Sequence, residues 1–478
     1  MHTPSSLRVG TTPTAFALLL ALGGCMSFIP TYERPPVPVA PAYAPESTPA
    51  GAPAGVPGGA AAADIEWQQF FADPRLKRLI ALSLQNNRDL RIAILSIEQA
   101  RAAYQIKRAD ELPSVGAGLT AQRQAAGSAG LINTYAAGFQ VTGYELDFFG
   151  RVRALSQAAL SQYLATEEAR KTAQISLVAA VAITYVNQLA DDELLRVTRD
   201  TLKTREDSFR LTKLRFDNGA SSEVDLRQAE QLLETARATL AQTQRQRALD
   251  DNALTLLVGQ PLPADLPAGL PLAAQQGMAD PPAGLPSDLL ARRPDVRSAE
   301  QQLKAANANI GAARAAFFPR ISLTASAGTA STELSGLFKS GSFALTGAAS
   351  LLQPIFDAGR NQANLDVAKV GKDIAIAQYE RAIQTAFREV SDALAGRATL
   401  GEQLRAQAAV ANAAQVSFKL ADLRYRNGAA SYFDVLDAQR TLFSAQQATV
   451  QTQALQVQNR VTLYKVLGGG WTEPAKVD

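Results

Sequence analysis

The sequence is almost without the two residue types on which much enzyme chemistry depends. Its 478 residues include one cysteine, Cys25, and one histidine, His2. Both lie within the first 25 positions, so if this leader is a cleaved signal, the mature chain keeps no histidine and at most a modified thiol at its new N-terminus. A Ser-His-Asp triad, a Cys-His nucleophile pair, a histidine zinc site, a disulfide framework and a CxxC redox pair would then lack the residues they need. Carboxylate-only catalysis is the enzyme class that this absence leaves open.

Neither sign of charge dominates. The chain carries 47 basic and 44 acidic residues, a formal net charge of +3. A nucleic-acid partner would require a strongly basic surface, so none is expected. A composition of 47% hydrophobic and 19% charged residues is typical of an ordered chain.

Residues 1–24 have the features of a secretory signal: a basic start, an apolar core and small residues at the end. The apolar core is too short for a membrane-spanning helix. The segment Leu22-Gly23-Gly24-Cys25 resembles a bacterial lipobox, which implies cleavage before Cys25 and acylation of this cysteine. An ordinary signal with an incidental cysteine is the alternative. The residue after the cysteine is Met26, not the aspartate that would imply retention in the inner membrane. The lipoprotein pattern therefore predicts the outer membrane.

Proline is absent from residues 114–260 and 355–473. Since proline interrupts helix interiors, these are the stretches in which long helices can form. Residues 261–286 are rich in proline and predict an irregular connector. The proline- and alanine-rich residues 25–63 predict an extended, poorly packed tether that starts at the lipidated cysteine.

The two halves of the chain are copies of one unit. The heptapeptide Leu214–Ala220 (LRFDNGA) recurs at a spacing of 209 residues as Leu423–Ala429 (LRYRNGA). Several motifs at one spacing are the mark of an internal duplication. The predicted organisation is a signal peptide (1–24), a lipidated cysteine and tether (25–63), a first repeat (64–260), a connector (261–286), a second repeat (287–469) and a tail (470–478).

Each repeat is predicted to contain a helix, two strands, a very long helix, a tight turn and another helix. Apolar residues recur every three or four positions in the helical stretches, as in Leu226, Ala229 and Leu233. The long helices are predicted at about 151–216 and 360–425, each about 100 Å at 1.5 Å per residue. Shorter helices are predicted at about 77–110 and 222–257.

Alternation of apolar with small or polar residues predicts four strands. Two begin near Val115 and Ile321, and their partners cover about 134–148 and 342–356, joined by loops at 123–133 and 330–341. Ten or more residues per strand are enough to cross an outer membrane when tilted. A soluble pair of hairpins packed on helices is the alternative. Four strands are too few to close a transmembrane barrel, so the membrane interpretation requires several chains.

Several motifs in a fixed order resemble the outer-membrane factors of tripartite (RND-type) efflux pumps, which are TolC-like, and in particular the NodT-type efflux lipoproteins. The resemblance covers about residues 67–469, and its motifs are Ala291–Val296 (ARRPDV), Ala305–Gly311 (AANANIG), Phe317–Pro319 (FFP), Gln353–Arg360 (QPIFDAGR) and Leu436–Gln439 (LDAQ).

The resemblance implies a mainly α fold with a membrane β part. Long helical hairpins would form a periplasmic tunnel, and each chain of a homotrimer would contribute four strands to a 12-stranded barrel. The protein would be a passive exit duct for drugs or other small toxic compounds, with no enzymatic activity and no cofactor besides the lipid on Cys25. Its implied partners are a periplasmic adaptor (membrane fusion) protein, an inner-membrane RND-type transporter and outer-membrane lipid. Its implied place is the bacterial outer membrane, where it would be lipid-anchored with its body in the periplasm.

The turns between long and short helices are the candidate functional site. Both contain a glycine that suits a helix end, and the pairs Ser222/Asp225 and Ser431/Asp434 fit a capping box. The resemblance implies that Asp434 and Asp437 form acidic rings at the tunnel entrance. It implies further that Asp225 and Tyr425 hold neighbouring helices together, and that the adaptor docks at Asn218, Gly219, Ala220, Asn427, Gly428 and Ala429. Helix capping alone is the alternative for Asp225 and Asp434, but it does not explain Asp437.

Other classes of protein fit less well. A type I protein-secretion channel is the nearest alternative. A structural coiled-coil envelope lipoprotein would account for the helices and the anchor, but not for strands inserted at the same place in both repeats. A carboxylate enzyme would need converging acids, whereas the acids here are spread along helices.

Overall fold

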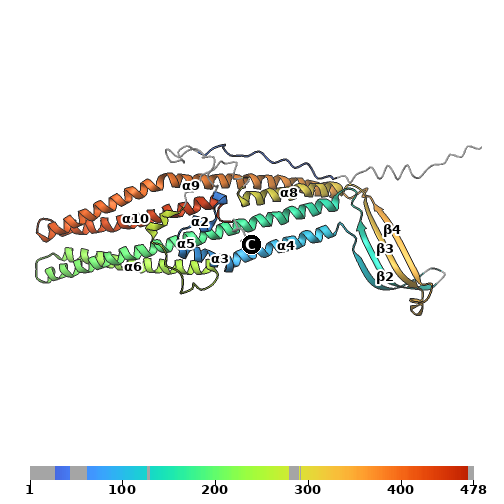
Figure 1. Ribbon diagram of the computed structural model, residues 1–478, viewed down its shortest axis with the longest axis horizontal. Helices are drawn as coiled ribbons and strands as arrows, with labels where there is room; N and C mark the ends of the chain where they lie inside the picture. The colour runs from blue at the N-terminus through green and yellow to red at the C-terminus, as the bar shows by residue number, and fades with distance from the viewer. Residues whose placement is uncertain are drawn as a thin grey trace, which may run out of the picture. The chain divides into compact units, whose positions relative to one another are not determined.

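The computed structural model describes residues 27–43, 62–125, 127, 130–278, 290 and 292–471 (Figure 1). The predicted signal peptide, Cys25 and parts of the tether, connector and tail lie outside these residues.

The first repeat contains α2 (Trp67–Phe70), α3 (Pro74–Asn86), α4 (Arg88–Ala109), β1 (Val115–Ala125), β2 (Leu131–Glu145), α5 (Arg151–Asp217) and α6 (Glu223–Val258). The second contains α8 (Pro294–Ala315), β3 (Arg320–Ser331), β4 (Phe343–Leu352), α9 (Arg360–Arg426) and α10 (Tyr432–Val466). Short 3-10 helices cover Ala62–Asp64, Leu272–Gly277 and Leu334–Gly336. The duplicated order of elements is confirmed, and α5 and α9 each have 67 residues.

The helix predicted over residues 77–110 is wrong as a single element, because the chain breaks at Asn87. The backbone of Asn87 is extended, with ψ near 131°. Its Oδ1 accepts a hydrogen bond from the amide of Leu90 at 2.9 Å, and its Nδ2 donates to the carbonyl of Leu257 at 2.9 Å. Asn87 therefore caps α4 and ties this break to the end of α6, a tertiary contact that the helical pattern does not reveal.

The strand boundaries also differ from the predictions. The first hairpin is tighter than expected, because β1 and β2 extend into the predicted loop at 123–133. The strands β2 and β4 end before residues 148 and 356. Pro354 lacks the amide hydrogen that a ladder requires, which accounts for the end of β4.

Contacts divide the chain into two compact units, and each unit draws on both repeats. One unit comprises the described residues of 1–35, 97–166 and 299–379, and therefore holds all four strands. The other comprises the described residues of 36–96, 167–298 and 380–478.

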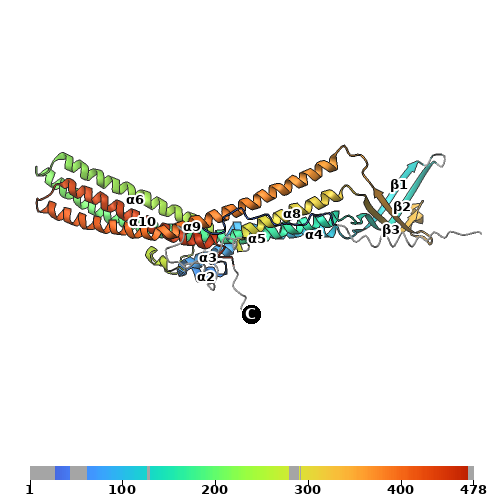
Figure 2. The same cartoon turned by 90° about the horizontal axis from the view of Figure 1, so that it is seen from above.

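The four strands form one antiparallel sheet in the order β1-β2-β3-β4, with β2 to β4 labelled in Figure 1 and β1 to β3 in Figure 2. The register sets Ala137 of β2 beside both Leu119 of β1 and Thr329 of β3. A bulge in β2 contains Gly143, with φ of +65°, and it brings Tyr144 opposite Leu323. Most large apolar residues of the four strands therefore share one face of the sheet.

The two faces of the sheet differ in chemistry. The apolar face contains Val115, Leu119, Tyr135, Phe139, Val141, Ile321, Leu323, Phe343, Leu345 and Leu351. The opposite face contains mainly small or polar residues, with Ile132 and Leu352 near the strand ends as exceptions. Its small or polar residues include Gly118, Thr120, Gln122, Thr134, Gln140, Ser322, Thr324, Ser326, Thr346 and Ser350. Side chains of the apolar face are exposed in the single chain: Phe343 is 75% exposed and Leu345 is 73% exposed.

The described N-terminal segment is extended, but the prediction that it is poorly packed is wrong for residues 28–34. The ring of Phe28 stacks on Phe318 with centroids 4.6 Å apart. Farther along, Nη2 of Arg34 donates to both carboxylate oxygens of Glu300, at 2.9 and 3.0 Å. These contacts hold the segment against α8 and the residues that follow it. A prediction from the composition of the segment itself does not include its contacts with distant residues.

The second unit contains the main apolar core, built from α2, α3, α5, α6 and α10. Tyr464 of α10 stacks on Phe70 with ring centroids 3.9 Å apart. Within α5, one stretch is long and apolar enough to span a membrane by composition, but 61% of that stretch is buried inside the protein. Core packing therefore accounts for its apolar residues.

Candidate functional site: the helix-turn tips

The turns α5-α6 and α9-α10 have the same backbone geometry. Gly219 and Gly428 take positive φ values of +74° and +73°. The amide of Ala220 donates to the carbonyl of Arg215 at 2.7 Å, and the amide of Ala429 donates to that of Arg424 at 2.8 Å. Both turns are thus glycine C-caps of the Schellman type.

Asparagines complete both turns. The Nδ2 groups of Asn218 and Asn427 each donate to a carbonyl four residues earlier, at 2.7 Å. The structure places the six tip residues in two equivalent exposed turns, whose geometry follows from the repeated Asn-Gly-Ala sequence. A role of these residues in adaptor docking stays a prediction.

Asp225 and Asp434 both cap helices. Ser222 and Asp225 form a capping box at the start of α6, and Ser431 and Asp434 form the equivalent box at the start of α10. In each box the serine hydroxyl accepts from the aspartate amide, and the carboxylate accepts from the serine amide. The capping interpretation is confirmed for both residues, and it does not prevent the outer carboxylate edge from facing a ligand or another chain.

Asp437 has a different environment. It lies one turn beyond Asp434 on the same helical face, with 61% of its side chain exposed. Its carboxylate pairs with Arg440 of α10 at 3.2 Å, an i,i+3 surface pair that contributes little stability. Within one chain, Asp437 has a local partner but no structural role that would require an aspartate.

Tyr425 links the two repeats. Nη1 of Arg215 on α5 donates to the Tyr425 hydroxyl at 2.6 Å, and the guanidinium lies 4.8 Å from the ring centroid. The rings of Tyr425 and Tyr432 have centroids 5.2 Å apart. Neither Arg215 nor Tyr432 belongs to the site predicted from the sequence. The sequence does contain a signal for Arg215. The first repeat has Phe216 where the second has Tyr425, and of these two side chains only tyrosine has a hydroxyl that can accept the hydrogen bond.

A small apolar cluster supports the tips. It contains residues from all four long hairpin helices, which lie side by side in this region in both views (Figures 1 and 2). Its buried members are Ala229, Leu232, Tyr432, Val435 and Leu436, with Phe209, Phe418, Ala421 and Tyr425 packed around them. The hydrogen bond between Arg215 and Tyr425 therefore lies beside a packed apolar cluster that holds the Tyr425 ring in position.

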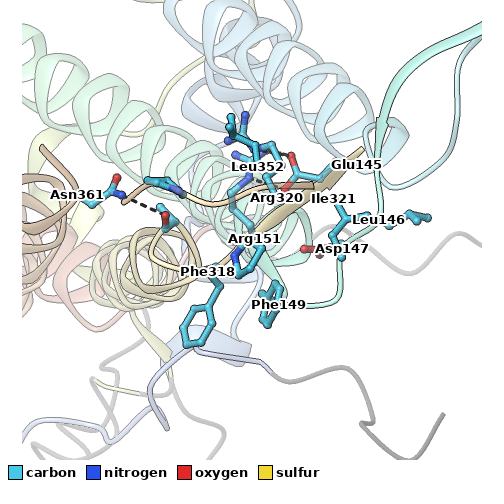
Figure 3. Close-up of a pocket in the computed structure, with 14 residues that line it drawn as sticks. Glu145, Leu146, Asp147, Phe149, Arg151, Phe318, Arg320, Ile321, Leu352 and Asn361 are labelled. Atoms are coloured by element: carbon cyan, nitrogen blue, oxygen red, sulfur yellow. Dashed lines mark hydrogen bonds and ion pairs between the residues drawn. The ribbon is translucent and has the colours of Figure 1, made fainter. Parts of the chain in front are cut away.

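Polar groups also converge where the sheet meets its helices, around a cavity of about 230 Å³ (Figure 3). Glu145, at the end of β2, accepts from Nε and Nη2 of Arg151 at 2.8 and 2.6 Å, and it pairs with Arg320 at 3.3 Å. Phe149 stacks on Phe318 with centroids 4.9 Å apart. This arrangement of matched charges and stacked rings joins strand to helix. Across the residues that the structure describes, no group of three or more His, Cys, Asp or Glu side chains could hold a metal ion.

Known proteins with similar sequences and structures agree on one family. The sequence profile of the family described as "Outer membrane efflux protein" matches residues 79–260 and 285–469. The toluene efflux pump outer membrane protein TtgC of Pseudomonas putida is 49% identical over 465 residues, which are 95% of this chain and 94% of that protein. The antibiotic efflux pump outer membrane protein ArpC, also of Pseudomonas putida, has the same identity and coverage.

Among solved structures, the open state of the MtrE outer membrane channel of Neisseria gonorrhoeae is 42% identical. It superposes with a TM-score of 0.83 over 93% of this chain and 98% of that chain. The family profile covers more than half of this sequence in two long matches, and the relatives match along nearly the whole chain. The protein therefore belongs to the outer membrane efflux protein family.

Proposed function

We propose that the protein is the outer-membrane exit duct of a tripartite efflux system and acts as a passive conduit. The observation that carries this proposal is the two-faced sheet, with an exposed apolar face and a face of small and polar residues. Its strands of 10 to 15 residues are long enough to cross an outer membrane. Apolar-out and polar-in alternation is the pattern of transmembrane strands around a lumen.

Closure of the sheet requires more than one chain. Among the described residues, β1 and β4 have no further strand beside them. An open edge in lipid would leave backbone groups without hydrogen bonds, so strands of other copies must complete the ladder. Three copies supply twelve strands and leave a lumen, whereas two copies supply eight, which side chains fill. A homotrimer is the assembly that suits a conduit.

The cargo and partners of the duct follow from the relatives. Two of them are named as outer membrane proteins of pumps for toluene and for antibiotics, which supports small toxic compounds as the cargo rather than a secreted protein. An efflux pump needs an energised inner-membrane component, for which we propose an RND-type transporter, and an adaptor that bridges it to the tips at Gly219 and Gly428. We propose that acylated Cys25 anchors the chain in outer-membrane lipid.

The gate of this duct is the pair Asp434 and Asp437, with Asp225 and Tyr425 as the residues that hold the tips in place. Threefold symmetry would bring three copies of each carboxylate together at the entrance. Three carboxylates at close range repel one another, and this repulsion favours the binding of cations at the entrance.

Single-channel conductance in planar bilayers tests the gate. We expect the Asp434→Ala/Asp437→Ala protein to carry a larger closed-state current than the unsubstituted protein, because the charged constriction is removed. Gln228→Ala is the matched control, since Gln228 holds the position of Asp437 in the first repeat. A closed-state current unchanged by the double substitution would overturn the gate assignment and leave the conduit itself in place.

A further inference from the structure

Arg205 of α5 is a buried cation without an anionic partner in the part of the chain that the structure describes. It is 3% exposed, and among the described residues no carboxylate pairs with it. Nη1 donates to the carbonyl of Leu232 at 2.8 Å, while the buried Nε has no hydrogen-bond acceptor. Burial of the guanidinium, and then the positive charge of Arg440, lower the pKa of Arg205. Proteins compensate a buried charge by pairing it with an opposite charge, and no described residue supplies that charge to Arg205.

The ring of Phe443 does not replace that partner. Its centroid lies 5.1 Å from the guanidinium carbon, which is within range of a cation–π contact. Such a contact recovers only part of the hydration that a buried ion loses, and it leaves the Nε donor without an acceptor.

Arg205 lines a groove of about 480 Å³ between α6 and α10. This volume lies in the range of small-molecule sites. The groove contains a second cation, Arg440, which also pairs with the exposed Asp437 at 3.2 Å, and none of its lining residues is an acid. Its other lining residues are amides, hydroxyls and apolar groups: Gln228, Gln231, Leu232, Thr235, Thr239, Phe433, Leu436, Phe443 and Gln447. Two guanidinium groups beside two phenyl rings are the chemistry that holds a carboxylate and an apolar body together.

The duplicated sequence indicates that the fold does not require this arginine. The equivalent position in the second repeat is Ala414, which is also buried. Arg440 and Phe443 likewise correspond to Gln231 and Glu234 in the first repeat. The cationic and aromatic side of the groove is therefore an addition to the common plan of the two repeats.

We propose that the groove between α6 and α10 binds a small carboxylate with an apolar body, and that Arg205 and Arg440 are its charged partners. This site goes beyond the conduit role, because it predicts binding by the helical hairpins themselves. Its test measures binding without transport, so its failure would leave the proposed duct untouched.

Equilibrium dialysis with radiolabelled benzoate tests the proposal on the full-length protein in a neutral maltoside detergent. We expect saturable binding of benzoate and at least tenfold weaker binding of benzamide, its neutral analogue. Arg205→Ala, which copies the second repeat, should weaken benzoate binding at least tenfold, and Arg205→Lys should retain part of it. Arg210→Ala is the matched control, because Arg210 is an exposed arginine on the same helix, and it should bind as the unsubstituted protein does.

Circular dichroism and elution volume establish that each variant is folded and assembled. Equal binding of benzoate and benzamide, or full benzoate binding by Arg205→Ala, would overturn the proposal. Loss of assembly in Arg205→Ala, together with no benzoate binding by the unsubstituted protein, would also overturn it. That result would assign the partner of Arg205 to an acidic side chain of a second copy.

Discussion

Asp191 of α5 and Asp250 of α6 are each 8% exposed, and each has one carboxylate oxygen without a hydrogen-bond partner among the described residues. Burial, and then the neighbouring charge of Asp250, raise the pKa of Asp191 to about 6. Burial also raises the pKa of Asp250. Neither effect is visible in the sequence, where both residues are ordinary helical acids.

This pair makes the stability of the second unit depend on pH. The pKa of Asp191 is higher in the folded chain than the usual 3.8, so the folded state binds a proton that the unfolded state has released. The free energy of unfolding therefore falls as pH rises from about 4 to about 6, by up to about 3 kcal/mol, and stays low above that range. Asp191→Asn should raise the thermal midpoint at pH 7.5 and have little effect at pH 4.

Intrinsic fluorescence during heating measures this midpoint. Asp192→Asn is the control, because Asp192 is half-exposed and pairs with Arg247 at 2.6 Å, so its loss should bring no gain. An equal change for Asp191→Asn at pH 4 and pH 7.5 would contradict the assignment.

At the scale of elements, the boundaries follow local chemistry and the breaks follow tertiary contacts. The repeated Asn-Gly-Ala sequences place the C-terminal ends of α5 and α9 within a residue or two, and the repeated Ser-x-x-Asp sequences do the same for the starts of α6 and α10, because caps are local. The break at Asn87 depends on the carbonyl of Leu257, far away in the sequence. For the same reason the Arg215–Tyr425 bond at the tips is a product of folding that the site prediction did not contain.

Gly138 of β2 and Gly328 of β3 face each other in the register. A Cβ atom at Gly328 would overlap with the carbonyl oxygen of Ala137 and with the Cα of Gly138. Gly328→Ala should therefore separate the two strands and reduce the amount of heat-stable, assembled protein on an unboiled gel.

Gly347→Ala on β4 is the matched control for this substitution. A Cβ atom there would meet nothing within 4 Å, so the assembled fraction should not change. If both substitutions had the same effect, chain flexibility rather than the close approach of β2 and β3 would be the cause.

At the scale of the whole molecule, the exposed apolar face and the open edges of the sheet are properties of an unassembled chain. A surface with Phe343 and Leu345 both about three-quarters exposed needs lipid or protein to cover it. The proposed trimer meets this need, since strands of neighbouring copies close the ladder and lipid covers the apolar face.

Native mass spectrometry of the detergent-solubilised protein tests this assembly. We expect one species with three times the mass of the acylated chain, because three copies close the sheet and leave a lumen. Detergent exchange provides the control, as a specific trimer should persist in several neutral detergents. A monomer or dimer in all of them would contradict the closed twelve-stranded arrangement.

The sequence by itself determined the duplicated order of elements, the length of α5 and α9, the turn chemistry and the alternation of the strands. These properties depend on neighbours within a few residues, or on a repeat that can be aligned. Tertiary structure alone decided that four apolar strand faces coincide, that Asn87 divides a helix, and that Arg205, Asp191 and Asp250 are buried. Burial and register depend on segments far apart in the chain, because only folding brings those segments into contact.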